Sequence, residues 1–175
     1  MNNISLYIHW PYCLKKCPYC DFNSHVAESI PQNSFADAYL TEINNFKNLL
    51  SNKNITSVYF GGGTPSLMDP IIVKNILDKL KAEYELPSNI EITLEANPTS
   101  VESSKFEKFA SAGINRVSLG VQSLRKEALA FLGREHSADE AKSALKIAKD
   151  NFANYNFDIS TCFKLIEFNI ITCFF

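Results

Sequence analysis

The stretch Cys13-Leu14-Lys15-Lys16-Cys17-Pro18-Tyr19-Cys20 brings three thiols together in one short segment, with the spacing C-x3-C-x2-C. Prolines at positions 11 and 18 disfavour a regular helix or a central strand, so the segment is predicted to be a loop. The two lysines beside the thiols favour the thiolate, which is the form that binds metal. Three ligands leave one coordination position open, and an open position is typical of a site that performs chemistry.

Three interpretations of this spacing differ in the metal that is bound. Zinc sites usually combine two pairs of ligands, whereas the other two cysteines, Cys162 and Cys173, lie at the far end of the chain. Closely spaced thiolates in a loop are typical of iron–sulfur clusters. We therefore predict a [4Fe–4S] cluster on Cys13, Cys17 and Cys20, with zinc and three unligated cysteines as the alternatives.

The residues around the thiols resemble a known family. With Tyr19 as the aromatic residue, the C-x3-C-x-aromatic-C run is similar to the signature of the radical S-adenosylmethionine (SAM) enzymes. The phrases Tyr7-Ile8-His9-Trp10-Pro11-Tyr12-Cys13 and Cys17-Pro18-Tyr19-Cys20-Asp21-Phe22-Asn23-Ser24 resemble the oxygen-independent coproporphyrinogen III oxidase group. The true oxidases carry a fourth cysteine two residues after the third, where this chain has Phe22. That difference favours the heme-chaperone branch of the group.

This resemblance implies a [4Fe–4S] cluster on the three cysteines and S-adenosyl-L-methionine on the open iron. In the family, the cluster donates one electron to the sulfonium of the cofactor, whose C5′–S bond then breaks. In the oxidases the resulting radical starts a decarboxylation in porphyrin biosynthesis. The chaperone branch instead binds heme and delivers it to respiratory proteins. Heme or a porphyrin, and heme-accepting proteins, are therefore the expected partners, without the oxidase activity.

Strand-like runs alternate with one-faced helical patterns along the rest of the chain. Strands are predicted over 4–9, 55–60, 90–96, 114–119 and 155–159, and helices over 31–50, 69–84, 99–113, 124–132 and 137–152. This alternation predicts βαβ units and a parallel sheet, hence an α/β fold. The residues alone do not distinguish between a doubly wound sheet and a partial barrel. The resemblance implies a parallel β/α partial barrel of the radical SAM type, incomplete at the C-terminus.

Glycine and polar residues follow the predicted strands, at the end where parallel β/α folds bind ligands. The run Gly61-Gly62-Gly63-Thr64 allows a close backbone approach, although an isolated triple glycine is more often a plain turn. Glu95 ends the third strand, where a buried carboxylate needs a partner; a structural salt bridge is the alternative to a ligand contact. Gln122, which offers both a donor and an acceptor, follows the fourth strand.

The resemblance gives each of these residues a role. It implies that the glycine motif pairs with the amino group of the cofactor and that Glu95 contacts the ribose. Arg134 is expected to pair with the cofactor carboxylate through two hydrogen bonds. The complete cofactor-binding set that the resemblance implies is Tyr7, Tyr19, Gly62, Gly63, Thr64, Glu95, Gln122, Arg134 and Asp158.

Length, charge and the distribution of apolar residues limit the classes of protein to which the chain can belong. A chain of 175 residues is long enough for one domain with a core, and a formal charge of −2 argues against nucleic acid as a partner. No run approaches the roughly 20 apolar residues of a transmembrane helix, and no secretory leader pattern opens the chain. Metal-spaced cysteines without an export signal predict the reducing cytoplasm.

The last residues depart from the pattern of the rest. We expect a radical SAM core over residues 1–159 and an atypical tail over residues 160–175. Relatives continue the fifth strand with a phrase that contains glycine and proline, whereas Ser160-Thr161-Cys162-Phe163-Lys164 abandons it, as a different reading frame would. An inactive truncated remnant is therefore a further hypothesis, beside the heme chaperone and the coproporphyrinogen oxidase.

Overall fold

The computed structural model describes residues 2–160, 163–165 and 170–172. The strands of the main sheet are β1 (Asn2–Trp10), β4 (Lys53–Gly62), β5 (Glu91–Ala96), β6 (Arg116–Gln122) and β7 (Asn154–Ile159). The helices are α1 (Gln32–Asn45), α2 (Lys47–Leu50), α3 (Pro70–Glu83), α4 (Ser100–Ser103), α5 (Phe106–Ala112), α6 (Lys126–Phe131) and α7 (Ala138–Asn151), and a 3₁₀ turn, η1, covers Pro65–Leu67. All five predicted strands are present, and their parallel α/β arrangement is confirmed.

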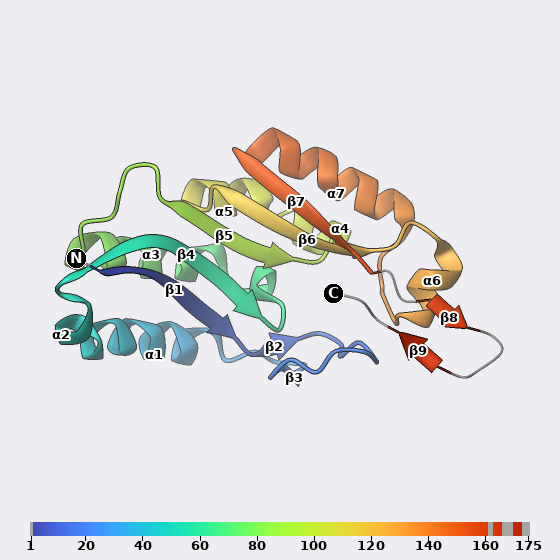
Figure 1. The fold of residues 1–175 in the computed structure, drawn as a ribbon, viewed down its shortest axis with the longest axis horizontal. Coiled ribbons are helices and arrows are strands. Elements are labelled where there is room, and N and C mark those ends of the chain that lie inside the picture. The colour runs from blue at the N-terminus through green and yellow to red at the C-terminus, as the bar shows by residue number, and fades with distance from the viewer. Residues whose placement is uncertain (1, 161–162, 166–169, 173–175) are drawn as a thin grey trace.

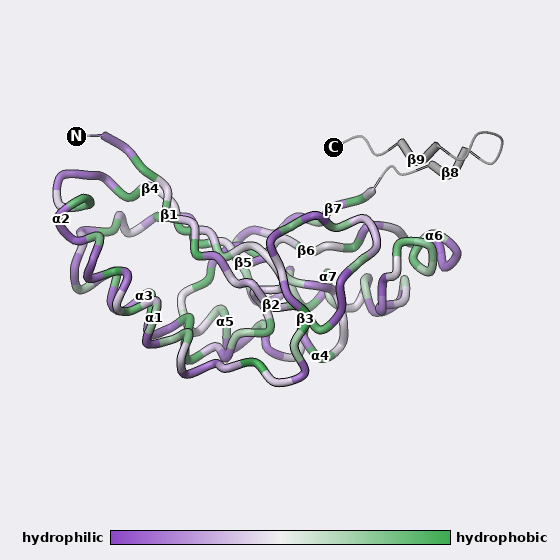
Figure 2. The backbone as a smooth tube through the Cα atoms, turned by 90° about the horizontal axis from the view of Figure 1, so that it is seen from below, coloured by the Kyte–Doolittle hydropathy of each residue, from purple (hydrophilic) through white to green (hydrophobic). Residues whose placement is uncertain are grey.

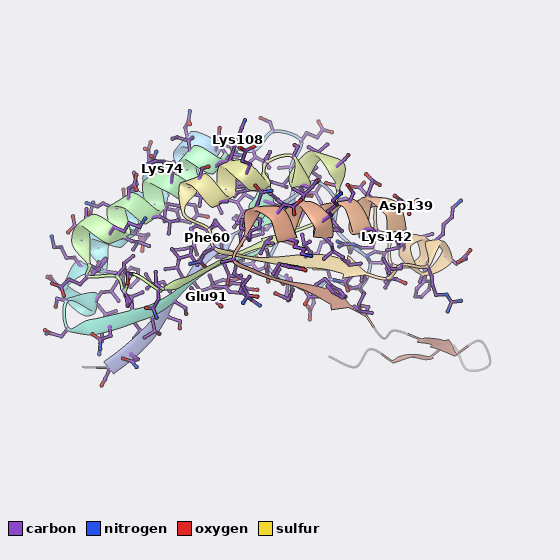
Figure 3. The ribbon with its side chains drawn as sticks, turned by 90° about the horizontal axis from the view of Figure 1, so that it is seen from above. Phe60, Lys74, Glu91, Lys108, Asp139 and Lys142 are labelled. Atoms are coloured by element: carbon purple, nitrogen blue, oxygen red, sulfur yellow. The ribbon has the colours of Figure 1, made fainter. Side chains whose placement is uncertain are left out.

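The five strands form one parallel sheet in the order β1-β4-β5-β6-β7 (Figure 1). Each strand lies beside its predecessor, and right-handed crossovers that all run in the same direction place the connecting helices on one face. Figure 3 shows these helices as a single layer on one side of the sheet. The described strands therefore form a singly wound sheet of the β/α barrel type, and not a doubly wound one.

The core lies between the sheet and this helix layer. Phe60 and Leu94 are completely buried, and Figure 3 shows Phe60 between the two layers. Hydrophobic and hydrophilic residues alternate along α1 and α3, so each helix has one apolar face (Figure 2). The intervening strand residues, such as Tyr59 and Glu95, point to the opposite face. That face is polar and is where ligands can reach the sheet.

Local chemistry explains several helix boundaries. Asp69 caps α3 by accepting a hydrogen bond from the backbone N–H of Ile71 at 3.1 Å, and proline occupies the first helical position, as predicted. Gly113 ends α5 with a φ of 114°. Ser137 and Glu140 form a reciprocal capping box at the start of α7.

Two helices that were predicted as continuous are interrupted. The region 99–113 divides into α4 and α5, and the region 31–50 divides into α1 and α2. At the end of α4, the hydroxyl of Ser103 donates to the carbonyl of Ser100 at 3.3 Å, and that of Ser104 donates to the carbonyl of Val101 at 2.7 Å. Such local hydrogen bonds compete with the helical ladder and favour a break.

The tail contains a short antiparallel hairpin of β8 (Phe163–Leu165) and β9 (Ile170–Thr172). The predicted domain boundary after residue 159 and the altered tail stay predictions, because residues 161–162, 166–169 and 173–175 lie outside the described residues. None of the described helices is long and apolar enough to cross a membrane.

Candidate cofactor and metal site

The cysteine loop is anchored at both of its ends. Strand β2 (Tyr12–Cys13) pairs in parallel with β3 (His25–Val26), where the loop returns to its starting point. The backbone N–H of His25 donates to the carbonyl of Pro11 at 2.7 Å. His9 adds a contact from β1, because its Nε2 lies 3.0 Å from the carbonyl oxygen of Asn23. Sequence reasoning missed this strand pair, which closes the segment that carries the thiols.

The glycine loop after β4 lies against the cysteine loop. The backbone N–H groups of Gly63 and Thr64 donate to the carbonyls of Trp10 and Tyr12, at 2.6 and 2.8 Å. A Cβ at position 63 would stand 2.6 Å from the Tyr12 carbonyl oxygen, so only glycine permits this approach. Thr64 Oγ1 lies 3.5 Å from Cys13 Sγ and donates to it. The glycines therefore serve the contact between the two loops as well as leaving backbone accessible to a ligand.

Glu95 is held at the end of β5 by two neutral donors. The hydroxyl of Tyr59 donates to Oε1 at 2.7 Å, and the backbone N–H of Gly62 donates to Oε2 at 3.3 Å. Burial raises the pKa of Glu95, these two hydrogen bonds lower it in part, and the charge of Asp158 raises it. The carboxylate is thus oriented by a tyrosine and a backbone amide rather than by a cation.

Gln122 and Asp158 come from the neighbouring strand ends. Gln122 has a φ of 66°, a conformation that is rare for a residue with a side chain, at an irregularity in the pairing of β6 and β7. Its Oε1 accepts a hydrogen bond from the hydroxyl of Ser160 at 2.7 Å. Asp158 accepts one from the hydroxyl of Ser118 at 3.2 Å. Strained backbone of this kind concentrates at functional sites.

Arg134 reaches the site from the loop between α6 and α7. Its Nη2 donates to the carbonyl of Gly120 at 2.6 Å and to Oδ1 of Asn97. Its Nη1 lies 3.5 Å from Cys17 Sγ and 3.5 Å from the hydroxyl oxygen of Tyr19. A carboxylate could accept two hydrogen bonds from the terminal nitrogens only by displacing some of these partners. The pairing with a cofactor carboxylate therefore stays a prediction.

These groups line one open cavity of about 170 Å³ at the carboxyl ends of the strands. All three cysteines and every residue of the predicted cofactor-binding set except Tyr7 belong to its wall. Tyr7 is 58% exposed and lies on the open face of the sheet, where its ring stacks on that of Tyr59 with 6.1 Å between the centroids. On the described residues, Tyr7 is thus a neighbour of the cavity and not part of its lining.

Several lining residues were not singled out from the sequence, among them Ser118, Gly120 and Asn97. Ser118 and Gly120 share a face of β6 with Gln122, so the strand alternation contained a signal for them. Asn97 also lines the cavity, and its side chain is the acceptor for Arg134. No spacing rule in the sequence connects these two distant positions.

The charges in the cavity are divided between two sides. Glu95 and Asp158 project from the sheet, whereas Lys15 and Arg134 come from the loops. Burial, the largest cause, raises the pKa of Tyr19 to about 12, although the charge of Arg134 lowers it in part. The tyrosine hydroxyl is therefore protonated at neutral pH. The separation of the carboxylates on the sheet from the cations on the loops suits a ligand that carries a carboxylate at one end and donor groups or a positive charge at the other.

The family of the chain follows from a comparison with family models. The model of the radical SAM superfamily matches residues 7–165. The chain therefore belongs to the radical SAM superfamily, and the family resemblance of its cysteine run is confirmed.

Individual relatives agree with this assignment. The heme chaperone HemW of Haemophilus influenzae is 43% identical over 162 residues, and HemW of Escherichia coli is 40% identical over 158 residues. Each alignment covers 89% of this chain but only 42% of the relative. Among solved structures, the radical SAM coproporphyrinogen III oxidase HemN of Escherichia coli matches with a TM-score of 0.81 and 27% identity, over 90% of this chain and 37% of HemN. The chain thus spans less than half the length of these relatives.

Membership of this superfamily implies a [4Fe–4S] cluster and S-adenosyl-L-methionine, and the residues present fit both. The three thiols are free of disulfides and share one cavity. Within the part of the chain that the structure describes, no three His, Cys, Asp or Glu side chains converge tightly enough to hold a single metal ion. A cluster suits three thiols that share one cavity, because each thiolate binds its own iron.

Proposed function

We propose that this chain holds a [4Fe–4S] cluster on Cys13, Cys17 and Cys20, binds S-adenosyl-L-methionine in the adjoining cavity, and handles heme in the manner of a HemW chaperone. The observation that carries the proposal is the convergence of the cysteine loop, the glycine loop and the carboxylates of Glu95 and Asp158 on one cavity. The likeness to the heme chaperones HemW of Haemophilus influenzae and Escherichia coli supports the heme-handling part.

In this proposal the chain's own residues bind and orient. The cluster, when bound, supplies one electron to the sulfonium of the cofactor. The thiolates of the three cysteines anchor the cluster, and the backbone of the glycine loop receives the amino group of the cofactor. Glu95, already oriented by Tyr59 and Gly62, accepts hydrogen bonds from the ribose hydroxyls. Gln122 and Asp158 close the wall of the cavity on the side of β6 and β7.

Phe22 favours heme handling over decarboxylation. Phe22 is 59% exposed and lines the cavity. The oxygen-independent coproporphyrinogen III oxidases, which the cysteine loop resembles, carry a fourth cysteine at this position. Oxygen-independent coproporphyrinogen III oxidase is the second candidate, because the likeness to HemN extends over 90% of this chain. Either activity requires reduced thiolates, which suits a reducing compartment such as the cytoplasm.

The cluster and cofactor can be tested by EPR spectroscopy on chain that has been reconstituted anaerobically and reduced with dithionite. We expect a [4Fe–4S]⁺ signal that changes when S-adenosyl-L-methionine is added. Cys20→Ser should lose the signal, whereas Cys162→Ser, which changes a cysteine outside the C-x3-C-x2-C run, should keep it. A wild-type chain without a cluster would contradict the proposal and support the inactive remnant.

Heme handling can be tested with the same preparation. We expect titrated heme to produce a saturable Soret band and then to be transferred to an apo-heme acceptor protein, without carbon dioxide release from coproporphyrinogen III. Decarboxylation would identify the second candidate as correct. Failure to bind heme while the cofactor-dependent EPR change persists would exclude the chaperone role of this chain and leave its radical SAM site intact.

A further inference from the structure

The contacts of Arg134 account for most of the donor capacity of its side chain. A guanidinium has five N–H donors in a fixed planar arrangement. Nη2 donates to Gly120 and Asn97, and Nη1 faces the sulfur of Cys17 and the hydroxyl of Tyr19. Nε is buried and has no partner among the described residues. The contacts at Nη2 orient the guanidinium against Asn97, after β5, and Gly120, in β6. Its Nη1 group then points to the cysteine loop.

The backbone next to Arg134 also fixes this position. Gly133 has a φ of 66°, and a Cβ there would stand 2.7 Å from Cδ of Pro18, the residue between Cys17 and Tyr19. The backbone N–H of Arg134 donates to the carbonyl of Leu129 at 2.9 Å, which ties the loop to α6. The loop after α6 thus lies directly on the cysteine loop, and the guanidinium cannot swing far without breaking several contacts.

The neighbouring cations do not make an equivalent contact. Lys15 pairs with Glu135 at 3.8 Å, and Lys16 donates to the carbonyl of Phe22 at 3.3 Å. Among the described side chains, Arg134 supplies the cationic N–H group that lies within hydrogen-bond distance of a cysteine sulfur. The other group at Nη1 is the hydroxyl oxygen of Tyr19, at 3.5 Å.

The physical consequence concerns the reduction potential of the cluster. Hydrogen bonds to the sulfurs and the net charge nearby are among the factors that set this potential. Reduction adds one negative charge to the cluster. A half-buried cation that donates to a ligand sulfur stabilises the reduced state more than the oxidised state. Such a contact therefore makes reduction easier.

We propose that Arg134 tunes the cluster: its Nη1 donates a hydrogen bond to Cys17 Sγ, and its charge raises the reduction potential of the cluster. This inference rests on the cluster of the proposed function and is independent of heme. It also differs from the expected pairing of Arg134 with the cofactor carboxylate, because it requires no cofactor.

The test is a redox titration of the reconstituted full chain in the absence of S-adenosyl-L-methionine. Dithionite supplies the electron that converts [4Fe–4S]²⁺ into [4Fe–4S]⁺, and the EPR signal of the reduced form gives the midpoint potential. Arg134→Met removes the charge and the donors, so its midpoint should be more negative than that of the wild type. Arg134→Lys keeps a charge but loses the fork, so its midpoint should fall between the two. Arg125→Met, an exposed arginine just before α6, is the matched control and should keep the wild-type midpoint.

The outcomes separate this inference from its alternatives. Wild-type midpoints in both Arg134 variants would overturn it, and a weaker EPR response to added S-adenosyl-L-methionine would then assign Arg134 to the cofactor carboxylate. If both variants fold but retain no cluster, Arg134 serves cluster retention and the tuning role is wrong. A wild-type chain that binds no cluster would overturn this inference together with the proposed function. Absence of heme binding would affect only the proposed function.

Discussion

Glycine at position 63 decides how closely the two loops of the site approach. Its backbone N–H donates to the carbonyl of Trp10, and the Tyr12 carbonyl oxygen occupies the space that a Cβ would need. Gly63→Ala must therefore displace the cysteine loop by part of an ångström or more. We expect the variant to fold but to bind less iron and sulfide per chain, which elemental analysis after reconstitution would measure.

Gly113→Ala is the matched control for this prediction. Gly113 precedes the amino end of β6, whereas the cavity lies at the carboxyl ends of the strands, and it ends α5 with a φ of 114°. Alanine in a left-handed conformation costs about 1–2 kcal/mol, so this variant should lower the melting temperature but keep the wild-type iron content per folded chain. Equal iron contents in the two variants would contradict the role assigned to Gly63.

At the scale of elements, a buried carboxylate joins η1 to α4. Glu102 is 3% exposed and accepts hydrogen bonds from the hydroxyl of Ser66, the backbone N–H of Asn97 and the hydroxyl of Thr99. Burial raises the pKa of Glu102 above its usual value, and these hydrogen bonds lower it in part. The network holds the 3₁₀ turn after the glycine loop against the segment that follows β5.

The raised pKa predicts a pH-dependent contribution to stability. The folded chain holds the proton of Glu102 more tightly than the unfolded chain, so ionisation costs stability as the pH rises from the unfolded pKa through the folded one. Glu102→Gln cannot ionise and keeps one acceptor oxygen. We expect its melting temperature, relative to that of the wild type, to increase as the pH rises through this window. A difference between Glu102→Gln and the wild type that stays constant across this window would contradict the prediction.

The capping box of α7 gives a second prediction at this scale. The hydroxyl of Ser137 accepts a hydrogen bond from the backbone N–H of Glu140 at 3.2 Å, and the Glu140 side chain accepts one from the Ser137 backbone N–H at 2.9 Å. Ser137→Ala should cost about 1 kcal/mol, a drop of about 2–4 °C in melting temperature.

Ser143→Ala is the control, because it makes the same substitution at a position where the melting temperature should not fall. Ser143 is exposed in the interior of α7, where alanine is the better helix former. Its melting temperature should stay equal or rise slightly. If both variants lower the melting temperature by the same amount, the capping box does not explain the effect of Ser137→Ala.

At the scale of the whole molecule, the singly wound sheet separates a structural face from a functional face. Leu94 and Glu95 are adjacent in β5, yet Leu94 is fully buried under the helices while Glu95 lines the cavity. Leu94→Ala should destabilise the chain by about 2–5 kcal/mol, because it leaves a cavity in the core. Chemical denaturation followed by circular dichroism would measure this loss.

Phe157 offers the control on the edge strand. It lies in β7 and is 51% exposed, so Phe157→Ala should cost less than about 1 kcal/mol. A loss as large as that of Leu94→Ala would mean that β7 is covered by other parts of the chain in solution. Phe157 pairs with Leu119, and Leu119 pairs with Ala96, so Phe157 lies on the same face of the sheet as Leu94. The difference between the two variants therefore reports how completely the helices cover this face at the centre of the sheet and at its edge.

The sequence by itself determined the local structure and the chemical class of the site. The spacing of Cys13, Cys17 and Cys20 predicted the family, and short-range periodicity together with the cap at Asp69 predicted the five strands of the main sheet and the helices, apart from the breaks within 31–50 and 99–113. These features depend on residues within a few positions of each other, so they can be read without knowing the fold. The end-of-strand rule predicted that the cysteine loop, the glycine loop, Glu95 and Gln122 lie together, whereas Arg134 and Asp158 were predicted from the family resemblance.

Only the tertiary structure decided the contacts that join distant segments. Arg134 lies 117 positions from Cys17, and the hydrogen bond between them exists because the strand order brings the loop after α6 over the cysteine loop. The same order placed the helices on one face and left Tyr7 outside the cavity lining. Strand order and crossover direction are cooperative properties of the packed chain, because each depends on which surfaces are buried together.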